Sequence, residues 1–147
     1  MSNKTIEKRM KKVIDYVMTN ALEYETFTGA MLMKDDEIIY KEMTSISKDH
    51  NPLAHAELKV IQRAIEKYGN DLSSFQLYTT QKPCMMCASA IVWSGIQEVF
   101  YGVNSNHHWR YDNDIHDFFA NHNVVCFGPI LEDECQKIDQ YLISNGI

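Results

Sequence analysis

Long apolar runs are missing from this chain of 147 residues. No stretch approaches the roughly 18 consecutive apolar residues of a membrane-spanning helix, and the first residues lack the apolar core of a secretory signal. The chain also has no internal repeat, low-complexity tract or obvious linker. With 45% hydrophobic residues, it is expected to form a single domain over residues 1–147 with no membrane segment.

Cysteine and basic residues are also scarce. Four cysteines do not make a disulfide framework, so we expect a reducing, cytoplasmic environment. The net charge is −6, and five of the 14 basic residues lie within the first twelve positions. We expect that short basic turn to be the solvated face of an amphipathic helix. A protein that grips a large folded RNA needs a broad basic surface, which makes a large nucleic acid an unexpected partner here.

Two short motifs carry most of the chemical information. They are His55-Ala56-Glu57 and, further along the chain, Pro83-Cys84-Met85-Met86-Cys87. Together they offer three good zinc ligands, His55, Cys84 and Cys87, and one acid, Glu57, that is not needed as a ligand. Zinc held by three protein groups keeps its fourth position for water, which is typical of a catalytic site. We therefore expect one Zn²⁺ per chain.

The residue types fit hydrolysis. Zinc bound by two thiolates and one imidazole lowers the pKa of its water to about 7, so that a zinc-bound hydroxide is present at neutral pH. Glu57, placed beside that water, would accept its proton, pass it to a ring nitrogen and later protonate a departing amine. These roles describe hydrolytic deamination.

A purely structural zinc site is the alternative explanation of the same residues. Such a site needs a fourth ligand, for which the sequence offers five candidates: His50, His107, His108, Cys126 and Cys135. A structural site would leave Glu57 without a purpose. The two-part motif is also far more specific than an isolated pair of cysteines.

Periodicity predicts alternating helices and strands. Apolar residues at helical spacing from Ile6 to Ala21 predict a first amphipathic helix. The segments 29–33 and 38–43 predict a β-hairpin, and 77–80, 98–102 and 123–127 predict three further strands. A helix is expected to start at Asn51-Pro52 and stop at Gly69, another follows Pro83, and a last one covers 131–142.

This arrangement places both motifs at the beginnings of helices. Residues two apart on a regular helix point to nearly opposite sides, so His55 and Glu57 can converge only in an end-of-helix geometry. Cys126, Cys135 and Trp93 are expected to pack in the core.

Both motifs and their flanks resemble the cytidine deaminase-like superfamily, the CMP/dCMP-type zinc-binding deaminases. The resemblance includes the H-x-E and P-C-x-x-C signature of zinc nucleobase deaminases. It extends through Thr28–Met33, Asn51–Glu57, Leu77–Thr80 and Val99–Gly102. Within the superfamily the chain is most similar to the branch that holds guanine deaminases and tRNA adenosine deaminases. The resemblance implies a three-layer α/β/α fold with a five-stranded mixed sheet, a homodimer, and a role for the backbone N–H of Ala56 in holding the substrate.

Two positions depart from that branch. Thr44 stands where the branch has an asparagine that hydrogen-bonds the base or ribose, and a threonine cannot replace both the donor and the acceptor of a carboxamide. Lys82 stands where the branch usually has glutamate. Thr44 is either a substrate contact or an ordinary strand-end residue. With both departures, the sequence is also compatible with a partner protein that binds zinc but does not catalyse deamination.

The segment from Asn104 to Ile115 lacks the Lys/Gly/Ala-rich pattern of the tRNA enzymes. Guanine deaminases have an aromatic and acidic segment there, and a carboxylate in it contacts N–H groups of the purine. Asp112 or Asp114 resembles this carboxylate. Phe27 and Trp109 are candidates to stack on the base. The sequence thus favours a guanine deaminase-like enzyme for a small nucleobase or nucleoside, with tRNA adenosine deamination as the alternative.

Overall fold

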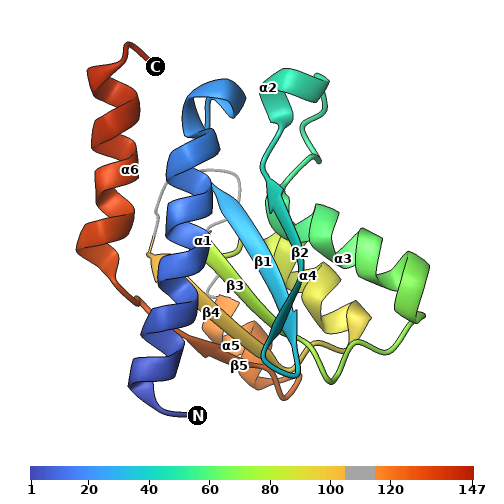
Figure 1. Ribbon diagram of the computed structural model, residues 1–147. Helices are drawn as coiled ribbons and strands as arrows, with labels where there is room; N and C mark the ends of the chain where they lie inside the picture. Colours follow the sequence, from blue (N-terminus) through green and yellow to red (C-terminus); the bar gives the residue numbers. More distant parts are fainter. Residues whose placement is uncertain (105–114) are drawn as a thin grey trace.

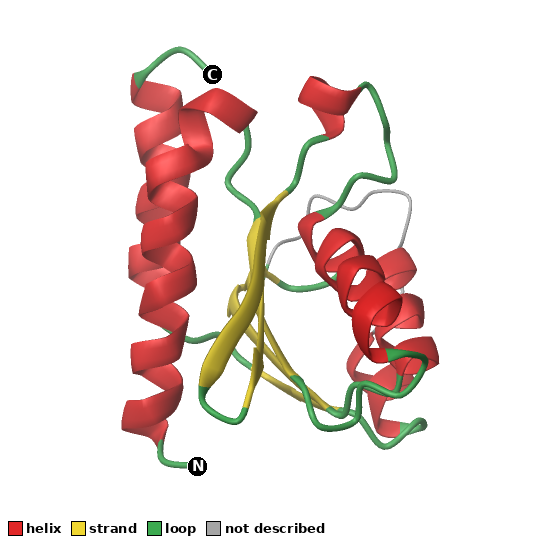
Figure 2. Cartoon of the chain, turned by 45° about the vertical axis from the view of Figure 1, so that its right-hand side comes forward, coloured by secondary structure: helices red, strands yellow, loops and turns green. Residues whose placement is uncertain are grey.

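The computed structural model describes residues 1–104 and 115–147 and contains a five-stranded mixed sheet between two layers of helices (Figures 1 and 2). The strands are β1 (Gly29–Lys34), β2 (Glu37–Met43), β3 (Gln76–Gln81), β4 (Glu98–Val103) and β5 (Val125–Phe127). The helices are α1 (Asn3–Tyr24), α2 (Ile46–Asp49), α3 (Ala56–Tyr68), α4 (Met85–Ser94), α5 (Ile115–Ala120) and α6 (Glu132–Ser144). This is the α/β architecture that the resemblance implied.

The strand order is β2-β1-β3-β4-β5. β1 runs antiparallel to β2 and to β3, whereas β3, β4 and β5 are parallel. The predicted hairpin is confirmed, and its turn is made by Asp35 and Asp36, both with positive φ. Two consecutive residues of positive φ match the strand twist in a tight hairpin. α3 and α4 occupy the connections between strands, which is why their N-termini meet near the end of β3.

Helices cover both faces of the sheet. α1 and α6 pack on one face, and α3, α4 and α5 pack on the other (Figure 2). Successive strand residues point to opposite faces. Accordingly Leu77 belongs to the core cluster under α3 and α4, and its neighbour Tyr78 belongs to the cluster under α1 and α6. The central strand β3 therefore packs apolar or aromatic side chains against both helix layers.

The first helix forms as its periodicity predicted, and its buried face comprises Ile6, Met10, Val13, Ile14, Val17 and Ala21. Ser2 caps its start, where the Ser2 hydroxyl accepts from the N–H of Thr5 at 3.2 Å. No helix within the described residues has both the length and the apolar character needed to cross a membrane.

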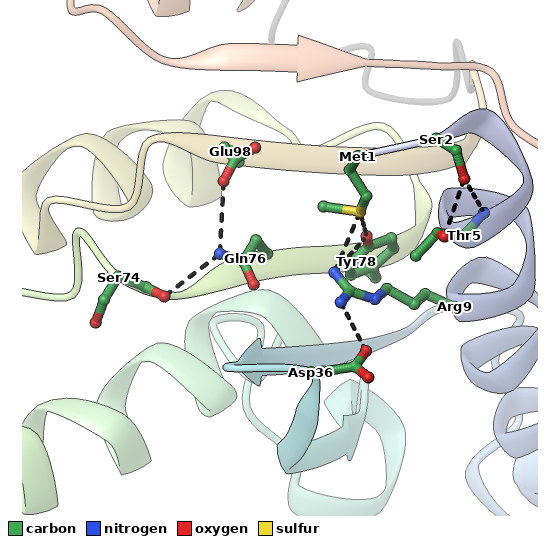
Figure 3. Close-up of polar contacts among 9 residues, drawn as sticks. All are labelled: Met1, Ser2, Thr5, Arg9, Asp36, Ser74, Gln76, Tyr78 and Glu98. Atoms are coloured by element: carbon green, nitrogen blue, oxygen red, sulfur yellow. Dashed lines mark hydrogen bonds and ion pairs between the residues drawn. The ribbon is translucent and has the colours of Figure 1, made fainter.

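The basic turn of α1 is only partly solvated, which corrects the sequence-based expectation. The Arg9 side chain is 11% exposed, and its guanidinium pairs with Asp36 of the hairpin at 2.8 Å and lies 3.4 Å from the Tyr78 hydroxyl (Figure 3). Lys11 pairs with Asp15 and with Glu134 of α6. These contacts join α1 to the sheet and to α6, while Lys4, Lys8 and Lys12 remain exposed.

The two short helices α2 and α5 are not predicted by the sequence. With four and six residues, they are too short to display a helical period.

Candidate metal and catalytic site

The first motif lies at the start of α3. This helix begins four residues after Pro52, and therefore later than the sequence predicts. Asn51 explains the difference, because its side-chain Oδ1 accepts from the N–H of Leu53 at 2.9 Å and its carbonyl accepts from Ala54 at 3.1 Å. Such a local turn competes with the helix. The expected helix start at Asn51-Pro52 is therefore wrong, and α3 begins at Ala56.

The later start accounts for the convergence of His55 and Glu57. His55 is the N-cap residue with extended backbone angles (φ −81°, ψ 142°), while Glu57 lies in the first helical turn. The helical rotation that would separate residues two apart does not apply across a cap. Both side chains are thus free to approach one site.

The second motif is built in the same way. Cys84 is the N-cap of α4, again with extended backbone angles (φ −74°, ψ 171°), and its carbonyl accepts from Ala88 at 2.8 Å. Cys87 follows in the first turn. Both sulfurs are buried. Two helix N-termini therefore supply all three proposed ligands.

The three ligand atoms lie together. His55 Nδ1 is 3.6 Å from Cys84 Sγ and 3.5 Å from Cys87 Sγ, and all three atoms are within 4.8 Å of one another. A tetrahedral zinc with ordinary Zn–N and Zn–S bonds holds such a nitrogen and sulfur about 3.6 Å apart. The residues present fit this ion.

No fourth histidine, cysteine or acidic ligand joins the cluster within residues 1–104 and 115–147. Three of the five candidates for a structural site, His50, Cys126 and Cys135, are described and are not part of it. The other two, His107 and His108, lie outside the described residues. The His-Cys-Cys triad is typical of zinc deaminases, which leave the fourth position open.

The cluster favours an ionised thiol at Cys84. Hydrogen bonds from Cys87 and from His55 lower the pKa of Cys84 to about 4, despite its burial. The pKa of Cys87 is raised, first because it donates to Cys84 and then because it is buried. The hydrogen bond with Cys84 also raises the pKa of His55. One thiolate is thus prepared for a cation, and metal binding would release the proton of the other.

Glu57 is the acid beside this cluster. Its side chain is 3% exposed, and burial raises its pKa to about 7, although a hydrogen bond from its own backbone N–H and the nearby His55 act in the opposite direction. Its Oε1 has no hydrogen-bond partner among the described residues. Buried carboxylate oxygens normally have a partner. An unpartnered one beside three ligand atoms is suited to hold and transfer a proton near neutral pH.

Thr44 and Ala56, both candidate substrate contacts, interact with each other. The hydroxyl of Thr44 accepts from the backbone N–H of Ala56 at 3.0 Å, in the buried space between the end of β2 and the start of α3. Lys59 strengthens this junction, because its ammonium donates to the Met43 carbonyl at 2.9 Å and to the Ser45 hydroxyl at 2.8 Å. Substrate contact by Thr44 and Ala56 stays a prediction.

The remaining candidates are more scattered. Phe27 packs against the cluster under α1 and α6, and its carbonyl accepts from the Thr80 hydroxyl at 2.9 Å. Trp109, Asp112 and Asp114 lie outside the described residues. Contacts of these four residues with substrate stay predictions. Lys82 is half-buried and donates through its backbone to Val103 at 2.8 Å.

Expectations for three core residues have different outcomes. Cys135 is buried as predicted, and Cys126 is partly buried. The prediction that Trp93 packs in the core is wrong, since 87% of its side chain is exposed on α4. The helical period at this position is compatible with either orientation, because α4 is apolar on most sides. An exposed tryptophan is compatible with the predicted homodimer, which stays a prediction.

Sequence reasoning did not single out Thr79 or Gln81. Both are buried polar residues of β3 on the same side of the strand as Leu77. A signal was present, since three consecutive polar residues, Thr79, Thr80 and Gln81, end the strand shortly before Cys84, and buried polar residues are unusual in a core strand.

Comparison with known proteins adds independent support. Residues 4–133 match the family model of the MafB19-like deaminases. A tRNA-specific adenosine deaminase from Buchnera aphidicola subsp. Baizongia pistaciae is 31% identical over 133 residues, which cover 88% of this chain and 82% of that protein. The Bacillus subtilis guanine deaminase is 38% identical over 76 residues, which cover 51% of this chain and 49% of that protein.

The fold is also found among solved structures. A guanine deaminase from Nitrosomonas europaea superposes with a TM-score of 0.83 over 93% of this chain and 84% of that one, at 21% sequence identity. At this identity the match concerns the fold alone. Relatives that match over most of the chain are mainly tRNA-specific adenosine deaminases, whereas the guanine deaminase matches over about half.

Proposed function

Because this chain belongs to the MafB19-like deaminases, within the cytidine deaminase-like superfamily, we propose that it removes the exocyclic amine of a purine base by hydrolysis. The family and the His-Cys-Cys triad make it a zinc deaminase.

The mechanism rests on one observation, the buried carboxyl of Glu57. Its carboxyl is buried beside the three ligand atoms, and Oε1 is unpartnered among the described residues. A structural zinc site has no use for such a group. In a hydrolytic site it is the proton carrier, because a carboxyl that is neither permanently ionised nor permanently protonated both accepts and donates.

The reaction exchanges an amine for oxygen, so that water and the aminopurine become ammonia and the oxo-purine. His55, Cys84 and Cys87 would hold the zinc, which when bound supplies Lewis acidity that lowers the pKa of water to about 7. Glu57 takes the proton lost by water at its free oxygen and transfers it to the ring nitrogen next to the attacked carbon. Glu57 then takes the remaining proton from the hydroxyl now attached to the ring carbon and delivers it to the amine, so that the C–N bond breaks, ammonia leaves and the carbonyl forms. Thr79 lies next to the Glu57 carboxyl.

The relatives favour adenosine in tRNA as the first candidate substrate, because they match over the greater part of both chains. This order reverses the sequence-based preference for guanine, which becomes the second candidate. The exposed lysines of α1 lie in the helix layer opposite the one that holds the metal ligands. They therefore provide no basic surface beside the site, and this observation keeps the small-base alternative in consideration.

A substrate panel tests the proposal. Ammonia release by the zinc-loaded protein is measured with guanine, guanosine, adenine, adenosine, cytosine, cytidine and a tRNA that carries a wobble adenosine. We expect turnover of a purine substrate. If the tRNA is the substrate, kcat/KM falls steeply with salt, whereas a free base shows little dependence on salt. Turnover of pyrimidines alone would contradict the purine assignment.

Glu57→Gln is the matched control for this panel. It preserves the size of the side chain but cannot carry the proton, so kcat is expected to fall by about 10²–10⁴-fold. Zinc content, measured by atomic spectroscopy, is expected to stay at one per chain because Glu57 is not a ligand. Undiminished turnover in Glu57→Gln would refute the mechanism, and loss of zinc would assign Glu57 to the metal instead.

A further inference from the structure

A buried glutamine without a partner lies at the end of β3. The Gln81 side chain is 6% exposed, and its Oε1 has no hydrogen-bond partner among the described residues. A buried amide oxygen that lacks a partner destabilises the folded protein. Such a residue calls for an explanation, which the rest of the described protein does not provide.

Strand geometry directs Gln81 toward the metal-ligand side of the sheet. Residues two apart on a strand share a face. Leu77 packs in the cluster under α3 and α4, and the Thr79 side chain lies next to the Glu57 carboxyl. Gln81 is the next residue on this face, and only two residues separate it from Cys84. The carboxamide therefore lies on the side of the sheet where Glu57 and the three ligands are found.

The backbone around Gln81 is held in place. Its carbonyl accepts from the Thr79 hydroxyl at 3.1 Å, and the next N–H, that of Lys82, donates to Val103 of β4 at 2.8 Å. Gln81 itself pairs with Val103 in the parallel ladder. The carboxamide is thus attached to a fixed backbone. Selective recognition of a ligand requires such rigid positioning.

Gln76, at the other end of the same strand, shows the usual state of such a side chain. Its amide nitrogen donates to the Ser74 carbonyl at 3.3 Å and to Glu98 at 3.5 Å (Figure 3). Gln76 is also more exposed. Gln76, which is partly exposed, is thus hydrogen-bonded within the protein. Gln81, which is buried on the side of Glu57, has an acceptor oxygen without a partner among the described residues.

We propose that the Gln81 carboxamide determines substrate specificity by accepting a hydrogen bond from a ring or exocyclic N–H of the purine. This inference rests on the proposed function, because it requires a purine beside Glu57. Binding of a base with the matching N–H satisfies the buried oxygen. A base that lacks the N–H leaves the oxygen unpaired and is discriminated against.

The experiment compares purines that differ in their N–H groups. Values of kcat/KM are measured for 2,6-diaminopurine against adenine and for guanine against 2-aminopurine, each as the free base and at the target position of an RNA stem-loop. Dissociation constants for hypoxanthine and unsubstituted purine, which have no amine to lose, are measured by calorimetry. Wild type is compared with Gln81→Leu, which preserves the approximate volume, and with the control Gln76→Leu.

We expect wild type and Gln76→Leu to prefer the base richer in N–H groups by about tenfold or more in at least one pair, and Gln81→Leu to reduce that ratio to near one. Gln81→Leu should retain its zinc and a thermal midpoint at least as high as that of wild type, because an unpaired polar group has been removed. A purely structural role for Gln81 would lower the midpoint and leave the ratios unchanged.

The outcomes separate the two proposals. Turnover with ratios that Gln81→Leu leaves unchanged overturns the role of Gln81 alone. If turnover is absent but binding of hypoxanthine over purine still depends on Gln81, the proposed function fails and the role of Gln81 stands. If neither the free bases nor the stem-loops are turned over and no purine binds, both are overturned.

Discussion

At the scale of single residues, Thr44 links the end of one strand to the beginning of the metal-binding helix. The first N–H of α3 that needs an acceptor is that of Ala56, and the N-cap residue His55 provides no side-chain hydrogen bond because its ring belongs to the metal cluster. Thr44 supplies the acceptor from another element. A residue that departs from the family pattern thus has a clear structural role.

Replacement of Thr44 by valine tests this role. Valine preserves the shape but leaves the buried N–H of Ala56 unpaired, so the free energy of unfolding is expected to fall by about 1–3 kcal/mol. Thr44→Ser keeps the hydroxyl and should lose much less. Urea denaturation of the zinc-loaded variants measures both values. Equal stability of the valine and serine variants would show that the hydrogen bond contributes nothing.

The sequence predicts the metal ligands of the site better than it predicts the contacts of the residues around them. His55, Cys84 and Cys87 were identified by motif spacing and lie together in the structure. The sequence marks Gln81 as a polar residue at the end of a strand, but it indicates neither that its oxygen is unpaired nor that Thr44 bonds to Ala56. Each depends on which atoms of distant segments approach in three dimensions, and spacing along the chain carries no such information.

At the scale of elements, α6 packs on β4 where that strand has no side chain. A Cβ added at Gly102 would overlap the sulfur of Cys135 and would lie 2.9 Å from the Thr80 carbonyl oxygen. Cys135 is buried in the cluster under α1 and α6. The glycine in the stretch Val99–Gly102, on which the family resemblance partly rests, is therefore explained by the close approach of a helix.

Gly102→Ala is expected to destabilise the protein by about 1–3 kcal/mol, because overpacking forces neighbouring atoms to shift. Adding Cys135→Ala removes the sulfur and should restore part of the loss, while the contact with Thr80 remains. The double variant should then be more stable than the sum of the two single effects predicts. Thermal denaturation of all four proteins provides the comparison. Strict additivity would argue against a clash between α6 and β4.

Sequence patterns predict the strands and the long helices and miss the two short helices. All five strands and the helices α1, α3, α4 and α6 were expected, with α3 misplaced at its start. The period of α1 is visible from Ile6 to Ala21, over more than four turns. In contrast, α2 and α5 have too few residues to repeat a pattern, and the turn at Asn51 is decided by one side-chain oxygen.

At the scale of the whole molecule, the metal cluster connects two helices that lie on the same face of the sheet. His55 comes from the start of α3, and both cysteines come from the start of α4. β3 ends shortly before Cys84, the first of these cysteines. The order of layers followed from the family resemblance. The choice of purine did not, because a pocket assembled from several segments is decided by tertiary contacts.

Removal of zinc should therefore destabilise the entire protein. An ion that binds only the folded state adds about 4 kcal/mol to the free energy of unfolding at a thousand times its dissociation constant. We expect the thermal midpoint to fall on treatment with a chelator and to recover when zinc is restored. Cys87→Ser should abolish most of this zinc dependence, because it weakens the ligand set. Cys135→Ala removes a buried thiol outside the cluster and should leave the response to zinc intact. An unchanged midpoint after zinc has been stripped from wild type would mean that the cluster does not join α3 and α4 through the metal.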